Sequence, residues 1–209
     1  MRVSRETAAA HRAAIVRAAG RMFRRHGFER VGIAEITRAA GLTHGGFYGH
    51  FASKDALAAE ACEAAFADGL AVLEGAVDLE AYVRVYLSRA HRDHPESGCP
   101  MVALGGEVAH AGAEVRARYA EGVARFVDEL TKRMPGGSIE ARQRRASGLA
   151  ALLVGGLGLA RGLGASAPEI SDALLRALRE EARGLIGASG DAPAERATGT
   201  LGDSLPSNR

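Results

Sequence analysis

Apolar residues recur along this chain at the spacing of α-helices, and no stretch alternates with the period of two that marks a half-buried strand. The first helical stretch, over 15–23, carries apolar residues at i, i+3, i+4, i+7 and i+8. It ends at Gly27, a residue suited to the left-handed backbone that closes many helices. A short helix over 33–40 is expected next, and Gly41 stops it.

Ser and Thr are favourable residues at helix starts, so Thr43 and Ser53 are placed to cap a third and a fourth helix. Beyond Gly75, five further helical stretches are separated by prolines and glycines. They are expected at 79–90, 101–109, 115–130, 149–160 and 170–185. We therefore predict an all-α fold of about nine helices.

Charge is distributed unevenly over the 209 residues, although the net charge is only +2. Residues 1–60 hold ten Arg and Lys against five Asp and Glu, which leaves 17 basic and 20 acidic residues of the total 27 and 25 for the remainder. A basic head of +5 on a body of −3 indicates a polyanionic partner. A solvated, charged helix face is the alternative that charge alone leaves open.

The compartment expected from the sequence is the reducing cytoplasm. Cys62 and Cys99 do not make a disulfide framework, and the N-terminus has no apolar core of a signal peptide. The longest uncharged stretch, Ala146 to Ala160, is 15 residues long. A bilayer needs about 20 residues, so a buried helix is the better interpretation and no membrane partner is expected.

The region 27–57 reads GFERVGIAEITRAAGLTHGGFYGHFASKDAL. Two short helices with a tight turn at Gly41-Leu42 make a helix-turn-helix. Spacing and residue types over about residues 10–60 resemble the DNA-binding head of the TetR family of bacterial transcription regulators. The resemblance implies a helix-turn-helix DNA-binding domain over 1–57 and a helical effector-binding and dimerisation domain over 58–187. A tail over 188–209, with little to bury, is expected to be disordered.

The resemblance implies a sequence-specific regulator that binds palindromic double-stranded DNA as a homodimeric repressor. A small-molecule effector, or reaction with an electrophile or oxidant, would release it from the operator. Some family members have a Gly-Cys at the position of Gly98-Cys99, and some of those sense electrophiles. An inert, semi-buried thiol is the alternative for Cys99, and plain packing is expected for Cys62.

The proposed reading helix is rich in glycine, with Gly45, Gly46 and Gly49 in nine residues. Each costs about 1 kcal/mol relative to Ala in a helix, so propensity alone predicts a loop over 43–50. A helix there would have to be held by packing, and the glycines would allow close approach to a DNA backbone.

Outward-facing positions of this segment are the candidate DNA contacts. Thr43 and His44 lie at the end of the helix that faces base edges in a major groove. Tyr48 and Lys54 match family residues that contact phosphates, with a core aromatic and a solvated lysine as their respective alternatives. The family commonly has Ser or Thr at the position of Gly32, so a phosphate-contacting hydroxyl is missing here. The predicted DNA-binding residues are Gly32, Arg38, Thr43, His44, Gly45, Tyr48, His50 and Lys54.

In the family the middle helices enclose an effector pocket, and the last two helices form a four-helix bundle with a second copy. The candidate pocket residues are Tyr86, Cys99, Met101, Leu104, Glu107, His110, Tyr119 and Phe126. The candidate dimer residues are Leu152, Gly156, Leu157, Ala160, Leu163, Leu174, Leu178 and Leu185. Ordinary core or surface positions are the alternative for both sets.

A helical enzyme or small-molecule-binding protein with an incidental helix-turn-helix is the competing hypothesis. Glu107-x-x-His110 has the spacing of half a di-iron site, but no second Glu-x-x-His is present. His91-x-x-His94 lacks a third zinc ligand at a fixed spacing. No P-loop, dinucleotide fingerprint or Gly-x-Ser-x-Gly occurs, so no catalytic residue, metal or cofactor is predicted.

Overall fold

The computed structural model describes residues 4–188, which are helical apart from turns and short connections and contain no strand. Ten α-helices and one short 3-10 helix follow one another over this range. They are α1 (Arg5–His26), α2 (Ile33–Ala39), α3 (His44–Phe47), α4 (Lys54–Gly75), α5 (Leu79–Tyr86), α6 (Arg89–Asp93), η1 (Pro95–Ser97), α7 (Pro100–Val108), α8 (Ala113–Arg133), α9 (Ile139–Gly164) and α10 (Pro168–Gly187). The all-α prediction is confirmed.

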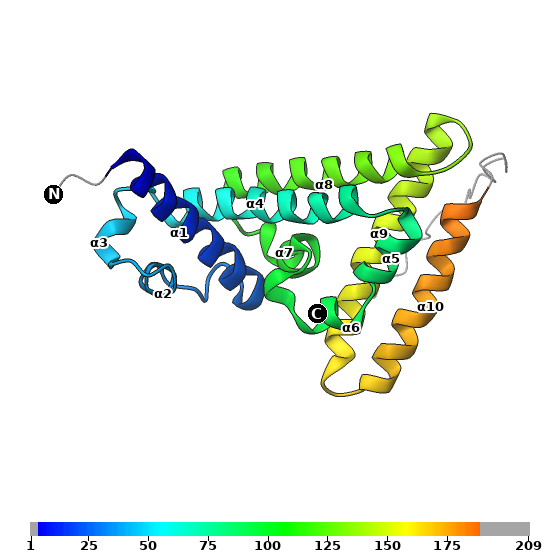
Figure 1. Cartoon of the computed structure of the whole chain (residues 1–209). Coiled ribbons are helices and arrows are strands. Elements are labelled where there is room, and N and C mark those ends of the chain that lie inside the picture. Colours follow the sequence, from blue (N-terminus) through cyan, green and yellow to red (C-terminus); the bar gives the residue numbers. More distant parts are fainter. Residues whose placement is uncertain (1–3, 189–209) are drawn as a thin grey trace, which may run out of the picture.

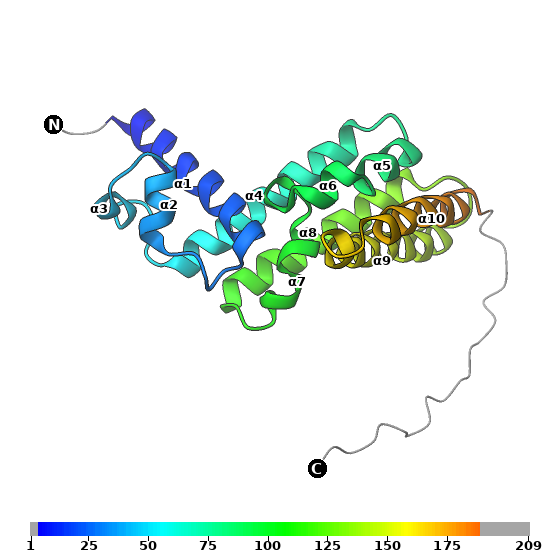
Figure 2. The ribbon, with the colours of Figure 1, turned by 90° about the horizontal axis from the view of Figure 1, so that it is seen from below.

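The molecule is elongated, with α1, α2 and α3 gathered at one end and the α9–α10 hairpin at the other (Figures 1 and 2). The long helices α4 and α8 lie side by side and join the two ends. The short helices α5, α6 and α7 fill the space between them and α9. A single continuous helix, α4, therefore connects the head to the body.

Polar side chains fix where several helices begin. The Ser53 hydroxyl accepts a hydrogen bond from the Ala56 N–H at 3.0 Å, as the sequence predicts. Asp78 caps α5 in the same way at 2.7 Å. Gly27 and Gly41 have φ values of +85° and +74°, which confirms that each supplies the left-handed backbone that ends a helix.

Two hydrophobic clusters divide the interior. The head cluster includes Ile15, Phe23, Ile36, Phe47 and Leu57, and its buried α4 residues continue to Ala61. The body cluster begins at Cys62 on α4 and includes residues of α5, α8, α9 and α10. The expected boundary at 57–58 thus falls inside α4, and residues 189–209 of the expected tail lie outside the described range.

Helices α1 and α9 begin about ten residues before their predicted stretches of 15–23 and 149–160, and two other predicted helices are broken or shortened. The expected helix over 79–90 is broken into α5 and α6, because Ser88 caps a new helix by accepting from the His91 N–H at 3.1 Å. The expected nine-residue helix after Thr43 has only four helical residues, His44–Phe47, and continues as a turn. The shorter helix agrees with the low helix propensity of its glycines.

Within residues 4–188, α9 is the one helix long and apolar enough to cross a membrane by length and composition. It packs between α8 and α10, and Leu149, Leu153 and Leu157 on it are fully buried. These contacts are those of a core helix. Since only 39% of its most apolar window is buried, much of its outer face stays uncovered within one chain.

Candidate DNA interface and effector cavity

The turn between α2 and α3 has the geometry of a helix-turn-helix. The Leu42 N–H donates to the Thr37 carbonyl at 2.8 Å, and the Gly41 N–H donates to the Arg38 carbonyl at 3.0 Å. Phe47 is fully buried and stacks on Phe51 with ring centroids 5.6 Å apart. These aromatic contacts hold the short, glycine-rich α3 against the rest of the head.

The residues on the other side of α3 point away from the head core. Thr43 and Gly45 are exposed, and a Cβ added to Gly45 would meet nothing within 4 Å. Tyr48 is 62% exposed, with its ring edge-on to Phe47. Thr43 is the N-cap residue of α3, as the sequence predicts, but its side chain makes no capping hydrogen bond, so its hydroxyl is available at the start of α3.

Two further predicted contacts, Gly32 and Lys54, flank this surface. Gly32 is the N-cap residue of α2 and has no hydroxyl to offer. Its backbone N–H donates to a Glu35 carboxylate oxygen at 3.0 Å. Lys54 begins α4, and its Nζ donates to the Glu29 carbonyl at 3.4 Å. This places an ammonium at a helix N-terminus, which itself favours anions.

The three remaining predicted DNA contacts are Arg38, His50 and His44. Arg38 is exposed near the end of α2. His50 is half-buried, with its ring edge-on to His11 at 6.4 Å between centroids. His44 begins α3.

A cavity of about 380 Å³ lies between α4, α5, α6, the start of α7 and α8. Its walls are mainly aromatic and aliphatic and include the rings of Phe66, Tyr82 and Phe126. A volume of this size is typical of small-molecule sites. Of the predicted pocket residues, the structure brings together Tyr86, Cys99, Met101 and Phe126 in its lining.

The other four predicted pocket residues do not line this cavity. Leu104 is buried in the head cluster, and Glu107 accepts from the Phe28 N–H at 2.6 Å. Tyr119 lies behind the wall, edge-on to Phe66, with its hydroxyl 3.4 Å from the Met101 carbonyl. His110 is exposed. Leu104 and Glu107 thus join the body to the head instead of facing the cavity.

His91 organises the part of the wall that contains Cys99. Its Nδ1 lies 2.8 Å from the Tyr86 carbonyl, and its Nε2 accepts from the Cys99 N–H at 2.8 Å. This pattern requires a neutral ring protonated on Nδ1. Burial lowers the pKa of His91 to about 4, and the nearby Arg161 acts in the same direction against the Tyr86 hydrogen bond.

The Cys99 thiol is buried, with 8% exposure for the residue. Burial raises its pKa, and this effect outweighs the Tyr86 hydroxyl and the Val102 and Met101 N–H groups, which favour the thiolate. The helix N-terminus therefore does not lower the pKa of this thiol, and its burial fits the alternative expectation of an inert thiol at Cys99. Burial also raises the pKa of Cys62, to about 11.

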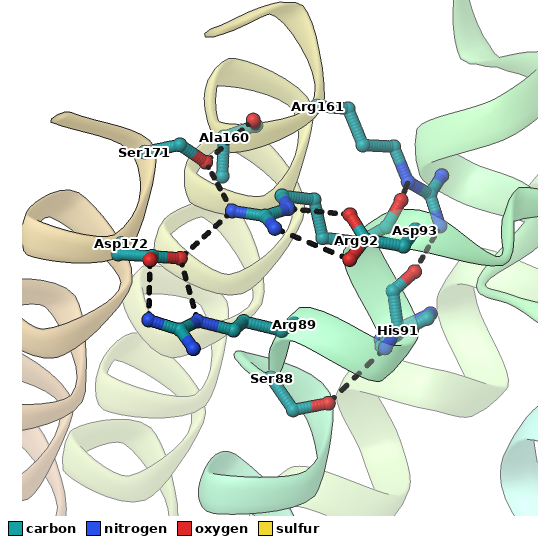
Figure 3. Close-up of polar contacts among 9 residues, drawn as sticks. All are labelled: Ser88, Arg89, His91, Arg92, Asp93, Ala160, Arg161, Ser171 and Asp172. Carbon is teal, nitrogen blue, oxygen red and sulfur yellow. Dashed lines mark hydrogen bonds and ion pairs between the residues drawn. The ribbon is translucent and has the colours of Figure 1, made fainter. Parts of the chain in front are cut away.

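A polar cluster fastens α6 to the α9–α10 hairpin (Figure 3). Asp172 on α10 accepts from Arg89 at 2.9 and 2.5 Å and from Arg92 at 2.9 Å. Arg161 on α9 donates to the His91 carbonyl at 2.9 Å. Gly98 is required beside this cluster, because a Cβ there would lie 2.6 Å from an Arg161 nitrogen.

The opposite end of the same segment is fastened to the head. Arg24, near the end of α1, lines the cavity and donates to the Glu96 carbonyl through Nε at 3.0 Å and Nη2 at 2.7 Å. The segment 89–101 therefore connects the hairpin, the cavity wall and the helix that supports the DNA-facing end.

The predicted dimer residues divide into two groups. Leu157 and Ala160 are fully buried within one chain, and Gly156 is covered by Leu178, whose Cδ1 would lie 2.3 Å from an added Cβ. These three build the protomer's own core and not an outer surface. The partly buried members are Leu152, Leu163, Leu174, Leu178 and Leu185.

Comparison with known families is decisive for the head. Residues 15–61 match the model of the bacterial regulatory proteins, tetR family. Residues 15–61 of this chain are therefore a TetR-family DNA-binding head. No curated protein matches the chain by sequence. The matched residues contain the whole helix-turn-helix, so the head is that of a DNA-binding transcription regulator, and the family consists of regulators and not enzymes.

Solved structures share the fold of the whole chain at low sequence identity. The reduced form of Escherichia coli NemR is 20% identical over 87% of this chain and 99% of its own, with a TM-score of 0.71. A TetR-family regulator from Cytophaga hutchinsonii is 19% identical over 90% and 100%, with a TM-score of 0.69. FadR from Bacillus subtilis in complex with stearoyl-CoA is 14% identical over 84% and 97%, with a TM-score of 0.57.

Sequence reasoning missed several residues of the cavity. Phe66 and Tyr82 sit at helical spacing and look like ordinary core positions. Arg24 counts only as one of many head arginines until the fold brings it to the cavity. His91 was weighed as a zinc ligand, whereas both ring nitrogens contact backbone; within residues 4–188 no three His, Cys, Asp or Glu form a metal-binding group.

Proposed function

We propose that this chain is a cytoplasmic homodimeric repressor that leaves its operator when a small molecule enters the cavity beside α5 and α6. The observation that carries the proposal is the position of Arg24. This residue belongs to the head helix α1, lines the cavity and is bonded to the cavity-wall segment at Glu96. A ligand that moves the wall therefore acts on the head directly.

The DNA surface in this proposal is the exposed side of α3 with its flanks. Thr43 and His44 would face base edges, with Gly45 allowing the backbone close to the duplex. Tyr48 and Lys54 would contact phosphates, with Gly32, Arg38 and His50 at the margins. The exposure of Thr43, Gly45 and Tyr48 and the helix N-terminus at Lys54 support this arrangement.

The homodimer would form through the outer face of the α9–α10 hairpin. Leu159 and Ile170 there are 63% and 62% exposed, and Ala151, Gly155 and Gly162 on the same side of α9 are exposed too. Small residues allow two helices to approach closely. The edges of this face would be formed by the partly buried leucines Leu152, Leu163, Leu174, Leu178 and Leu185. The proposed interface thus leaves out the core residues Gly156, Leu157 and Ala160 of the set predicted from sequence. Two heads would then read the half-sites of a palindrome.

Reversible binding is favoured over thiol chemistry as the releasing event. The Cys99 thiol is buried and its pKa is raised, whereas the thiolate is the reactive form. One structural relative, FadR, is described in complex with stearoyl-CoA, which supports a fold that accommodates small molecules.

The test begins with selection of bound duplexes from a random DNA pool. A palindromic consensus is expected, and candidate small molecules are then screened for release of the selected duplex. A Cys99→Ser variant that still responds to the releasing compound supports reversible binding. A consensus without twofold symmetry would contradict the dimer, and response lost only on Cys99→Ser would contradict reversible release.

A further inference from the structure

The cavity has an unusual distribution of polar groups. Its walls carry four aromatic side chains, and one of them, Tyr86, has a buried hydroxyl without a hydrogen-bond partner in the described part of the chain. Both His91 ring nitrogens are bonded to backbone, and the Ser88 hydroxyl caps α6. Near α6 a ligand therefore finds the His91 ring and the Ser88 hydroxyl already occupied, whereas the Tyr86 hydroxyl is open to it.

Arg24 is the one arginine among the lining residues. Its guanidinium is half-buried, and it donates only to a backbone carbonyl, that of Glu96. Among residues 4–188 no carboxylate lies within ion-pairing distance of it, although Glu96 pairs with the neighbouring Arg25 at 3.6 Å. Burial lowers the pKa of Arg24 and Arg21 lowers it further, while Asp68 opposes both. A buried cation without an ionic partner is energetically unfavourable, and an anion beside it would offset that penalty.

We propose that the cavity binds an apolar aromatic carboxylic acid, with the hydrocarbon part among Phe66, Tyr82 and Phe126 and the carboxylate on Arg24. This inference rests on the proposed function and names the ligand class of the same site. Arg24 belongs to the head helix, so the acid group would compete with the Glu96 carbonyl for the guanidinium and loosen the bond between head and wall. Asp68 lines the same end of the cavity, which makes an organic cation the competing ligand class.

The test is isothermal titration calorimetry of the full chain, without DNA, using three ligands of one shape. They are 2-naphthoate, the uncharged 2-naphthamide and the (2-naphthyl)methylammonium cation. Because a charge-assisted hydrogen bond is stronger than a neutral one, the acid should bind about tenfold more tightly than the amide. The cation should bind more weakly than both.

Arg24→Gln should remove this preference by reducing the acid affinity to that of the amide. Arg25→Gln is the matched control, since Arg25 is adjacent in sequence but does not line the cavity, and it should keep the preference. The acid-to-amide ratio is measured within each variant and does not depend on small differences in stability. The ratio in the natural chain stands as a test by itself if Arg24→Gln fails to fold.

Equal or tighter binding of the amide or the cation, absence of binding by the whole series, or a preference that survives Arg24→Gln would each overturn the proposal. The DNA readout is separate. If the acid binds with the expected preference but leaves the operator complex intact, the ligand class holds and the release mechanism fails. If another compound class releases DNA, the regulator function holds and the ligand class fails.

Discussion

His91 illustrates how one side chain can set the shape of a cavity wall. Its two ring nitrogens join the end of α5 to the Cys99 N–H, and its ring lies edge-on to Tyr86 at 4.7 Å. The Nε2 contact requires an unprotonated nitrogen. Protonation of this ring is therefore incompatible with the folded wall.

The free energy of unfolding should consequently fall as the pH is lowered through the window set by His91. The unfolded histidine takes up a proton near pH 6.5, whereas the folded one does so only near its lowered pKa of about 4. Stability from the neutral ring is thus present above about pH 6.5 and is lost toward about pH 4, by roughly 3 kcal/mol. Urea unfolding across this window should show a steeper loss for the natural chain than for His91→Asn. The same pH dependence in both proteins would contradict the assignment.

Thiol labelling tests the environment of Cys99. We expect slow alkylation of both cysteines by iodoacetamide in the native protein, because both thiols are buried and have raised pKa values. Labelling in denaturant should be fast and complete, which provides the control. Rapid native labelling of Cys99, detected by mass spectrometry of the peptides, would show that the wall opens and would revive the electrophile-sensing hypothesis.

At the scale of elements, the most informative case is α3. Propensity predicts a loop over 43–50, the family resemblance predicts a nine-residue helix, and the structure has a four-residue helix followed by a turn. Phe47 and Phe51 hold this segment by burial, so packing decides its place while the glycines limit its length. Propensity is therefore correct about the short length of the helix, and the family resemblance is correct that a helix begins after Thr43.

Replacing Gly45 by Ala should separate stability from DNA binding. The added Cβ meets nothing within 4 Å and the residue is helical, so the free energy of unfolding should rise by up to about 1 kcal/mol. Operator affinity should fall, because the methyl group would stand between the backbone and the duplex. Thermal unfolding and fluorescence anisotropy measure the two effects, with Gly106→Ala, in open space on α7, as the control. Unchanged operator affinity would place this face away from DNA.

Helices and caps can be predicted from local sequence, whereas contacts between residues distant in sequence cannot. Gly27 and Ser53 are local signals, and each marks a helix end or start at the predicted position. The break between α5 and α6 is also local, since Ser88 marks it, but Ser88 lies inside a continuous apolar period. By contrast, Arg24 meets Glu96 and Glu107 meets Phe28 across more than 70 residues, and nothing in their local sequence indicates these bonds.

At the scale of the whole molecule, the two ends are joined through one segment. Residues 89–101 are held to α9 and α10 by Arg161 and Asp172 and to the head by Arg24. The hairpin, the cavity and the DNA-facing end are thus mechanically continuous. This continuity is what allosteric coupling between a ligand and an operator requires.

The hairpin surface makes a prediction about assembly. Leu159→Glu would place a charge in the centre of the proposed interface and should shift the protein from dimer to monomer in sedimentation analysis, with a matching loss of operator affinity. Val77→Glu, at an 87% exposed position between α4 and α5, is the control and should stay dimeric. A dimer that survives Leu159→Glu would exclude this face of the hairpin.

Operator binding measured against salt concentration tests most directly whether α3 and its flanks read DNA. Affinity should fall steeply with salt, since each phosphate contact contributes a slope of about 0.9. Lys54→Ala should weaken selected and unrelated duplexes alike and reduce the salt slope by about one, whereas His44→Ala should change the ranking of duplexes. If neither substitution alters affinity, salt slope or sequence preference, the DNA surface lies elsewhere on the molecule.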